Sequence, residues 1–176
     1  MVVCGAKTTE YDYLKGFKSH FRRRNLSVQV TKKPGSPLQV VQYAVKRWGG
    51  AGGEFDGVWC VVDVDQFQDL DEALLCAAQN DVELVISNPC FEIWLLLHHI
   101  DHRKWVRDYN AVKPLLQQFV DVPSDKSVDF ARDFGGDRWK VAVERARPLA
   151  LEGSEHKTNP STRMWRLALA INGGDV

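Results

Sequence analysis

The chain has 176 residues, of which 44% are apolar and 26% are charged, and this composition excludes a disordered or a fibrous protein. Its 23 basic and 23 acidic residues cancel, and no apolar run reaches the ~18 residues that a membrane crossing needs. With no secretory signal visible at its start and four widely spaced cysteines, we expect a cytoplasmic protein with reduced thiols and no membrane partner.

The zero net charge hides an uneven distribution along the sequence. Residues 1–34 hold eight Lys or Arg and two acidic residues, whereas residues 54–101 hold eleven Asp or Glu and no Lys or Arg. An acidic middle between basic flanks suits a metal site beside a bound polyanion. The alternative is that the charges only occupy different solvated faces.

Strands and helices alternate in the first hundred residues. We predict strands at 1–4, 26–30, 58–62 and 82–86, and helices that begin at Thr8 or Thr9 and that cover residues 38–48, 69–80 and 90–99. This order predicts an α/β fold with a small, Rossmann-like parallel sheet of about four strands flanked by helices. After residue 100 the pattern predicts helices only, near residues 110–120, 127–134, 139–151 and 161–171. We therefore divide the chain into an α/β core over residues 1–100 and a helical extension over residues 101–176 packed on that core.

Two aspartates follow the most apolar predicted strand. Asp63 and Asp65 are two residues apart, so their side chains point the same way from an extended chain. Ligands gather at the carboxyl ends of parallel strands, and paired carboxylates are hard oxygen ligands for Mg²⁺ or Mn²⁺. The alternative is that these residues cap the next helix, but that helix is predicted to begin only near residue 69.

A second polar group follows the next predicted strand, at the same edge of the sheet. Glu92 falls in the first turn of an otherwise apolar helix, where it either faces Asp63 as a further metal ligand or faces solvent. Ser87 and Asn88 either orient a phosphate or form the turn. No histidine is spaced to activate Cys90, so we interpret this cysteine as a packing thiol.

A group of histidines and the tryptophans could also have a functional or a structural role. His98, Asp101 and His102 have the helical spacing of zinc ligands, but no third His or Cys accompanies them, and solvent exposure is the competing interpretation. The six tryptophans are assigned to core packing.

Four segments together resemble the RloB family, a set of Toprim-type proteins of prokaryotic defence and restriction-linked loci. They are Lys7-Thr8 after a strand and Gly5, residues 61–65 with the two aspartates, residues 86–98, and the Asn-Pro-Ser-Thr at 159–162. The similarity spans nearly the whole chain, and residues 86–98 are its most specific part. It implies a Toprim fold, a divalent-metal site for phosphodiester chemistry, and an ATPase partner in antiphage defence. It makes Asp63 and Asp65 metal ligands, and Asn88, Glu92 and residues 159–162 site or scaffold residues.

The chain departs from the family pattern at the first strand. The family has Glu-Gly-x-Lys-Thr-Glu, where the first Glu is a general acid/base or a metal ligand, and this chain has Cys4 and Thr9 in place of the two glutamates. A thiol does not replace a hard carboxylate at Mg²⁺. Glu10 stands one residue after Thr9 and substitutes in part for the missing acid there, but not for the one at Cys4.

Two functions follow from these features. The first is a metal-dependent nuclease that holds Mg²⁺ or Mn²⁺ on Asp63, Asp65 and Glu92, with Lys7 neutralising the scissile phosphate of DNA or RNA. Its nucleic-acid contacts are predicted at five basic residues: Arg22, Arg23, Arg24, Lys32 and Lys33. The second is a catalytically impaired binding or regulatory subunit that works with an ATPase or a larger complex. The sequence leaves the substrate and the formation of a homo-oligomer open.

Overall fold

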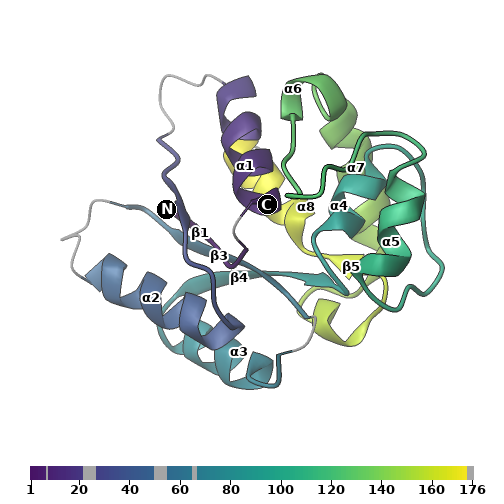
Figure 1. Cartoon of the computed structure of the whole chain (residues 1–176). Coiled ribbons are helices and arrows are strands. Elements are labelled where there is room, and N and C mark those ends of the chain that lie inside the picture. Colours follow the sequence, from purple (N-terminus) through teal and green to yellow (C-terminus); the bar gives the residue numbers. More distant parts are fainter. Residues whose placement is uncertain (7, 22–26, 50–54, 65–66, 174–176) are drawn as a thin grey trace.

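The computed structural model describes residues 1–6, 8–21, 27–49, 55–64 and 67–173. In this part of the chain, five strands form one sheet in the order β2-β1-β3-β4-β5 (Figure 1). The strands are β1 (Val2–Cys4), β2 (Val30–Lys32), β3 (Val58–Asp63), β4 (Val82–Asn88) and β5 (Ser161–Thr162). Strands β1 to β4 run parallel to one another, and β5 pairs antiparallel with β4.

Helices cover both faces of this sheet (Figure 1). One face carries α2 (Pro37–Gly49) and α3 (Leu70–Gln79). The other face carries α1 (Thr9–His20), α4 (Glu92–Leu97), α5 (Tyr109–Leu116), α6 (Phe130–Asp133), α7 (Arg138–Ala146) and α8 (Met164–Asn172). The fold is therefore mixed α/β, with a mostly parallel sheet between two unequal helical layers.

The strands are apolar on both faces because helices cover both. In β3, Val61 packs against the larger helical layer, while Cys60 and Val62 pack against α2 and α3. The uninterrupted apolar run of this strand is thus the pattern of a buried central parallel strand, and all three side chains are buried. At the end of this run the chain turns polar, so β3 delivers Asp63 to the carboxyl edge of the sheet.

The predicted α/β class and parallel sheet are confirmed, and two details are wrong. Residues after 100 do not form helices only, because β5 joins the sheet as a fifth strand and α8 begins at Met164 instead of residue 161. A two-residue strand is too short to show a period, and its pairing partners Ser87 and Asn88 lie more than 70 residues earlier in the chain. The strand predicted at 26–30 is Val30–Lys32, since pairing with β1 sets its position. The boundary at residue 100 stays a prediction.

The structure also bears on the state of the cysteines and on membrane-spanning helices. All four cysteines are free, and three of them, Cys4, Cys60 and Cys90, are buried. None of the helices in the described ranges has both the length and the apolar character that a membrane crossing requires.

Candidate metal and phosphate site

A cavity of about 190 Å³ opens at the carboxyl edge of the sheet. Its walls come from the loop after β1, the start of α1, the end of β3, the turn into α4, the start of α5 and the loop before α6. The lining residues are Ala6, Thr8, Thr9, Glu10, Asp63, Cys90, Glu92, Tyr109 and Lys126. We call this space the carboxylate cavity, because three of its lining side chains are acidic.

Asp63 lies where the sequence predicted it, at the last position of β3 and on the cavity wall. Helix α3 begins only at Leu70, and the residue at its N-cap position is Asp69. Asp63 is therefore not the cap residue of that helix. Its predicted partner Asp65 lies outside the described residues.

Glu92 is buried at the start of α4 and lines the same cavity, so the solvent-facing alternative for this residue is wrong. Glu10, in the first turn of α1, is buried as well, with 2% of its surface exposed. The pKa of Glu10 is raised to about 7, mainly by burial and in smaller part by the negative charge of Glu92, against the opposing effects of a backbone hydrogen bond and of Lys126. The cavity thus holds two buried acidic side chains that repel each other when both are ionised.

The other titratable lining groups feel the same negative charge. Burial raises the pKa of the Cys90 thiol, and the charges of Glu92 and Asp63 add to that rise. The pKa of Tyr109 is raised by burial and then by Glu92. Both side chains are therefore neutral at physiological pH, and the negative charge of the site belongs to its carboxylates. The interpretation of Cys90 as a buried, unactivated thiol agrees with this environment.

Cys4 occupies the end of β1 and is fully buried. Burial and then the charge of Glu10 raise the pKa of its thiol well above the ordinary value, so it stays protonated. The same interaction shows that Glu10 lies near Cys4. The sequence placed Glu10 one residue beyond the family position at Thr9, and the structure brings its carboxylate into the cavity.

Lys126 is the only cation among the described lining residues of the cavity, and sequence reasoning missed it. Its backbone has a positive φ of 58°, its carbonyl oxygen accepts a hydrogen bond from Thr9 Oγ1 at 3.1 Å, and its Nζ lies 3.5 Å from the centroid of the Tyr109 ring. A lysine in the loop before α6 carries no sequence signal for such a position. Its tertiary contacts with Thr9 and Tyr109 hold it at the cavity.

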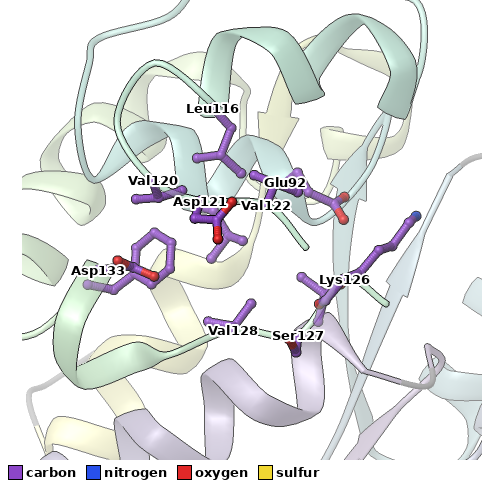
Figure 2. A pocket seen from close by; sticks show the side chains of 12 residues that line it. Glu92, Leu116, Val120, Asp121, Val122, Lys126, Ser127, Val128 and Asp133 are labelled. Atoms are coloured by element: carbon purple, nitrogen blue, oxygen red, sulfur yellow. The ribbon is translucent and has the colours of Figure 1, made fainter. Parts of the chain in front are cut away.

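Figure 2 shows a smaller, mostly apolar cavity of about 20 Å³ beside the first, which has room for about one water molecule. The two cavities share Thr9, Glu92 and Lys126. The charged ends of Glu92 and Lys126 lie on the same side in this view, away from Val120 and Val128 (Figure 2). Besides its apolar side chains, the lining of this smaller cavity includes the carboxylates of Asp121 and Asp133 (Figure 2).

The predicted basic contacts are only partly described. Lys7, Arg22, Arg23 and Arg24 lie outside the described residues, although Ala6 and Thr8 on either side of Lys7 line the cavity. Lys32 ends the edge strand β2 and is exposed, with its Nζ 4.1 Å from the centroid of the Tyr11 ring. The backbone N–H of Lys33 donates to the carbonyl oxygen of Cys4, which places Lys33 beside the end of β1. Nucleic-acid binding by these residues stays a prediction.

Asn88 and Asn159 form a second polar group, the asparagine cluster, where β4 ends. Asn159 Nδ2 donates to Asn88 Oδ1 and to the Val106 carbonyl oxygen, and Asn159 Oδ1 accepts from the Val106 N–H. Asn88 Nδ2 donates to the carbonyl oxygen of His156 at 3.1 Å. Ser87 and Thr162 bond to each other across the β4–β5 pair. These side chains bind protein groups and tie three segments together, which indicates a scaffold.

The histidine and tryptophan interpretations need two corrections. His98 does not face water: its Nδ1 donates to the Trp94 carbonyl oxygen, its Nε2 accepts from the Tyr13 hydroxyl, and burial lowers its pKa to about 3. With both ring nitrogens engaged, His98 is not available as a zinc ligand. Trp105 is not a core residue, because 67% of its surface is exposed. Periodicity could not show this, since Trp105 lies in a loop.

The types of ligand at the carboxylate cavity suit a hard divalent cation, but the spacing of the described side chains does not form a complete metal site. Glu10, Asp63 and Glu92 offer oxygen ligands of the kind that Mg²⁺ and Mn²⁺ take, and no soft ligand in the ionised form accompanies them. In the part of the chain that the structure describes, no three His, Cys, Asp or Glu side chains are grouped closely enough to hold one ion. A bound cation would offset the repulsion between Glu10 and Glu92.

The fold and the site together define an α/β protein with an acidic cavity at the carboxyl edge of a mostly parallel sheet. The sequence profile described as RloB-like protein matches residues 1–171, so the chain belongs to the RloB-like family. Comparisons with curated proteins and with solved structures found no match.

Proposed function

We propose that this protein is a divalent-metal-dependent nuclease whose site is the carboxylate cavity. The observation that carries the proposal is that Glu10, Asp63 and Glu92, from three separate segments, line one cavity at the sheet edge where ligands of parallel α/β folds bind. Asp63, Asp65 and Glu92 would hold the Mg²⁺ or Mn²⁺. When bound, such an ion polarises a phosphoryl oxygen and activates a water molecule.

The chain's own groups supply the remaining requirements. Lys126 neutralises the scissile phosphate from the cavity wall. Lys7, which lies outside the described residues, is predicted from the sequence to contribute a second positive charge. Glu10 accepts the proton of the attacking water, because its buried carboxyl group lines the cavity together with Asp63 and Glu92. The sequence predicted that Glu10 does not replace the family acid at Cys4, but its carboxyl group lies near Cys4 and lines the cavity. In this proposal Glu10 therefore takes over the acid/base role that the family assigns to that position.

Family membership also suggests the cellular location, the partner and the biological role of this activity. The RloB resemblance supports a Toprim-type arrangement of the site, a cytoplasmic location and a role in antiphage defence beside an ATPase partner. These expectations come from the family and from no contact in the structure.

A second candidate function is favoured by Cys4. Its buried, protonated thiol cannot supply the family carboxylate, and a Toprim-like site without that group would serve as a binding or regulatory subunit recruited by an ATPase. This candidate and the nuclease differ in whether Glu10 replaces the missing acid.

Cleavage of DNA and RNA in Mg²⁺ or Mn²⁺ separates the two candidates. For the nuclease we expect activity in the wild type, losses of about 100-fold or more in Asp63→Ala, Asp65→Ala and Glu10→Gln, and none in Asp71→Asn on the far helix α3. The double variant Cys4→Glu/Glu10→Gln keeps the number of acidic groups constant. An inert wild type with an active double variant identifies the impaired subunit, and activity that survives Asp63→Ala and Asp65→Ala contradicts the metal site.

A further inference from the structure

The loop between α4 and α5 carries a large apolar side chain on its surface. Trp105 is 67% exposed, while its neighbour Val106 is buried. Val106 is held by two hydrogen bonds to the Asn159 side chain, at 3.0 Å and 2.8 Å. The exposure of Trp105 therefore belongs to an anchored piece of backbone.

Three basic residues flank this tryptophan in the sequence. Arg103, Lys104 and Arg107 are exposed. Arg103 pairs with Asp101 and Arg107 with Asp108, but the arginines are 61% and 71% exposed, and exposed pairs of this kind contribute about 0–1 kcal/mol. A phosphate group can replace either carboxylate at little cost. Among the described residues Lys104 has no acidic partner.

This loop leads directly into the carboxylate cavity. Tyr109, the first residue of α5, lines the cavity and stacks against the Lys126 ammonium group. Tyr109 is four positions after Trp105, so their Cα atoms are at most about 14 Å apart. The start of α5 is fixed by the Asp108 side chain, which accepts a hydrogen bond from the Ala111 N–H.

We propose that Trp105 is a stacking platform for single-stranded nucleic acid, with Arg103, Lys104 and Arg107 binding its phosphates as the strand passes toward the cavity. Exposed aromatic rings between cations bind unpaired bases, whose faces are hidden in a duplex. A protein partner fits less well, because the centre of a protein interface is depleted of charge and no other exposed large apolar side chain of the described chain lies in this loop. The inference rests on the proposed function only for the direction of the strand.

Binding without metal tests the proposal independently of cleavage. Fluorescence anisotropy in EDTA would compare single strands of roughly 20 nucleotides, both oligo-dT and oligo-U, with a duplex of the same length. We expect single strands to bind more tightly than the duplex, Trp105→Ala to weaken single-strand binding by at least about fivefold, and Trp105→Phe to retain most of the affinity. Leu151→Ala, at an 83% exposed position in another loop, is the matched control and should bind as the wild type.

The cations have their own test. Lys104→Gln should lower the salt dependence of binding by about one ion, whereas Lys46→Gln on α2, on the opposite face of the sheet, should not. Trp105→Ala binding like the wild type, duplex binding as tight as single-strand binding, or a wild type that binds neither overturns the proposal. Wild-type binding without cleavage leaves this inference standing and removes the nuclease.

Discussion

Two polar groups lie at the carboxyl edge of the same sheet and differ in how their side chains are satisfied. In the asparagine cluster at the end of β4, side-chain amides bond to backbone groups and to each other. In the carboxylate cavity, Glu10 and Glu92 raise each other's energy when both are charged. Neutral groups with complementary partners hold a fold together, whereas like charges held together in burial favour a ligand of opposite charge. The difference separates scaffold from site among residues that the sequence could not separate.

The largest predicted effect is on stability and comes from a substitution in the asparagine cluster. Asn159→Ala removes three hydrogen bonds and leaves the Val106 N–H and carbonyl groups without their partner. We expect the free energy of unfolding, measured with urea, to fall by about 3 kcal/mol. Asn110→Ala, at an exposed position of α5, should change it by less than about 1 kcal/mol. A loss that small in Asn159→Ala would show that the cluster is not the scaffold.

The second prediction concerns pH and the site side of the comparison. The pKa of Glu10 is about 7 in the folded protein and near 4.5 in the unfolded chain, so the folded state binds the extra proton between these values. The contribution of Glu10 to stability in metal-free protein is therefore complete below about pH 4.5 and is lost as pH rises through 7.

Glu10→Gln isolates this contribution from those of other groups. We expect the variant to become more stable relative to the wild type as pH rises from 5 to 8, measured by urea unfolding in EDTA. A difference between the two proteins that does not change with pH would mean that Glu10 ionises normally.

The smallest predicted effect sharpens the electrostatics of the cavity. The positive charge of Lys126 lowers the pKa of Glu10, so Lys126→Met should raise that pKa slightly, as followed by NMR titration of the Glu10 carboxyl carbon. Lys126→Arg keeps the charge and should leave the titration nearly unchanged. Equal titrations in all three proteins would place Lys126 outside the electrostatic environment of Glu10.

The sequence predicted those parts of this structure that depend on local pattern. The apolar run of β3 ending at Asp63 identified both a central strand and a site residue, and helical spacing placed α1, α2 and α3. What it missed depends on contacts between distant segments. Lys126 reaches the cavity through its bond to Thr9, 117 residues away, and β5 forms only through pairing with β4.

Burial was the other quantity that pattern could not supply. Glu92 had two possible environments in the sequence, and the structure shows that it is buried. Trp105 was predicted to pack in the core, and it is exposed. For Glu10, the sequence identified its position next to the family motif. It could not predict that the side chain lines the cavity, because this depends on how β1 and α1 are placed relative to each other.

Titration with Mn²⁺ or Mg²⁺, followed by melting temperature, tests most directly whether the cavity binds a cation. At about 100 times the dissociation constant, binding stabilises the folded state by about 2.7 kcal/mol, which corresponds to a rise of roughly 5–10 °C. The account predicts this rise in the wild type and in Asp71→Asn, and its loss in Asp63→Asn and Glu92→Gln. A melting temperature that does not respond to either ion, or that responds equally in all four proteins, would contradict it.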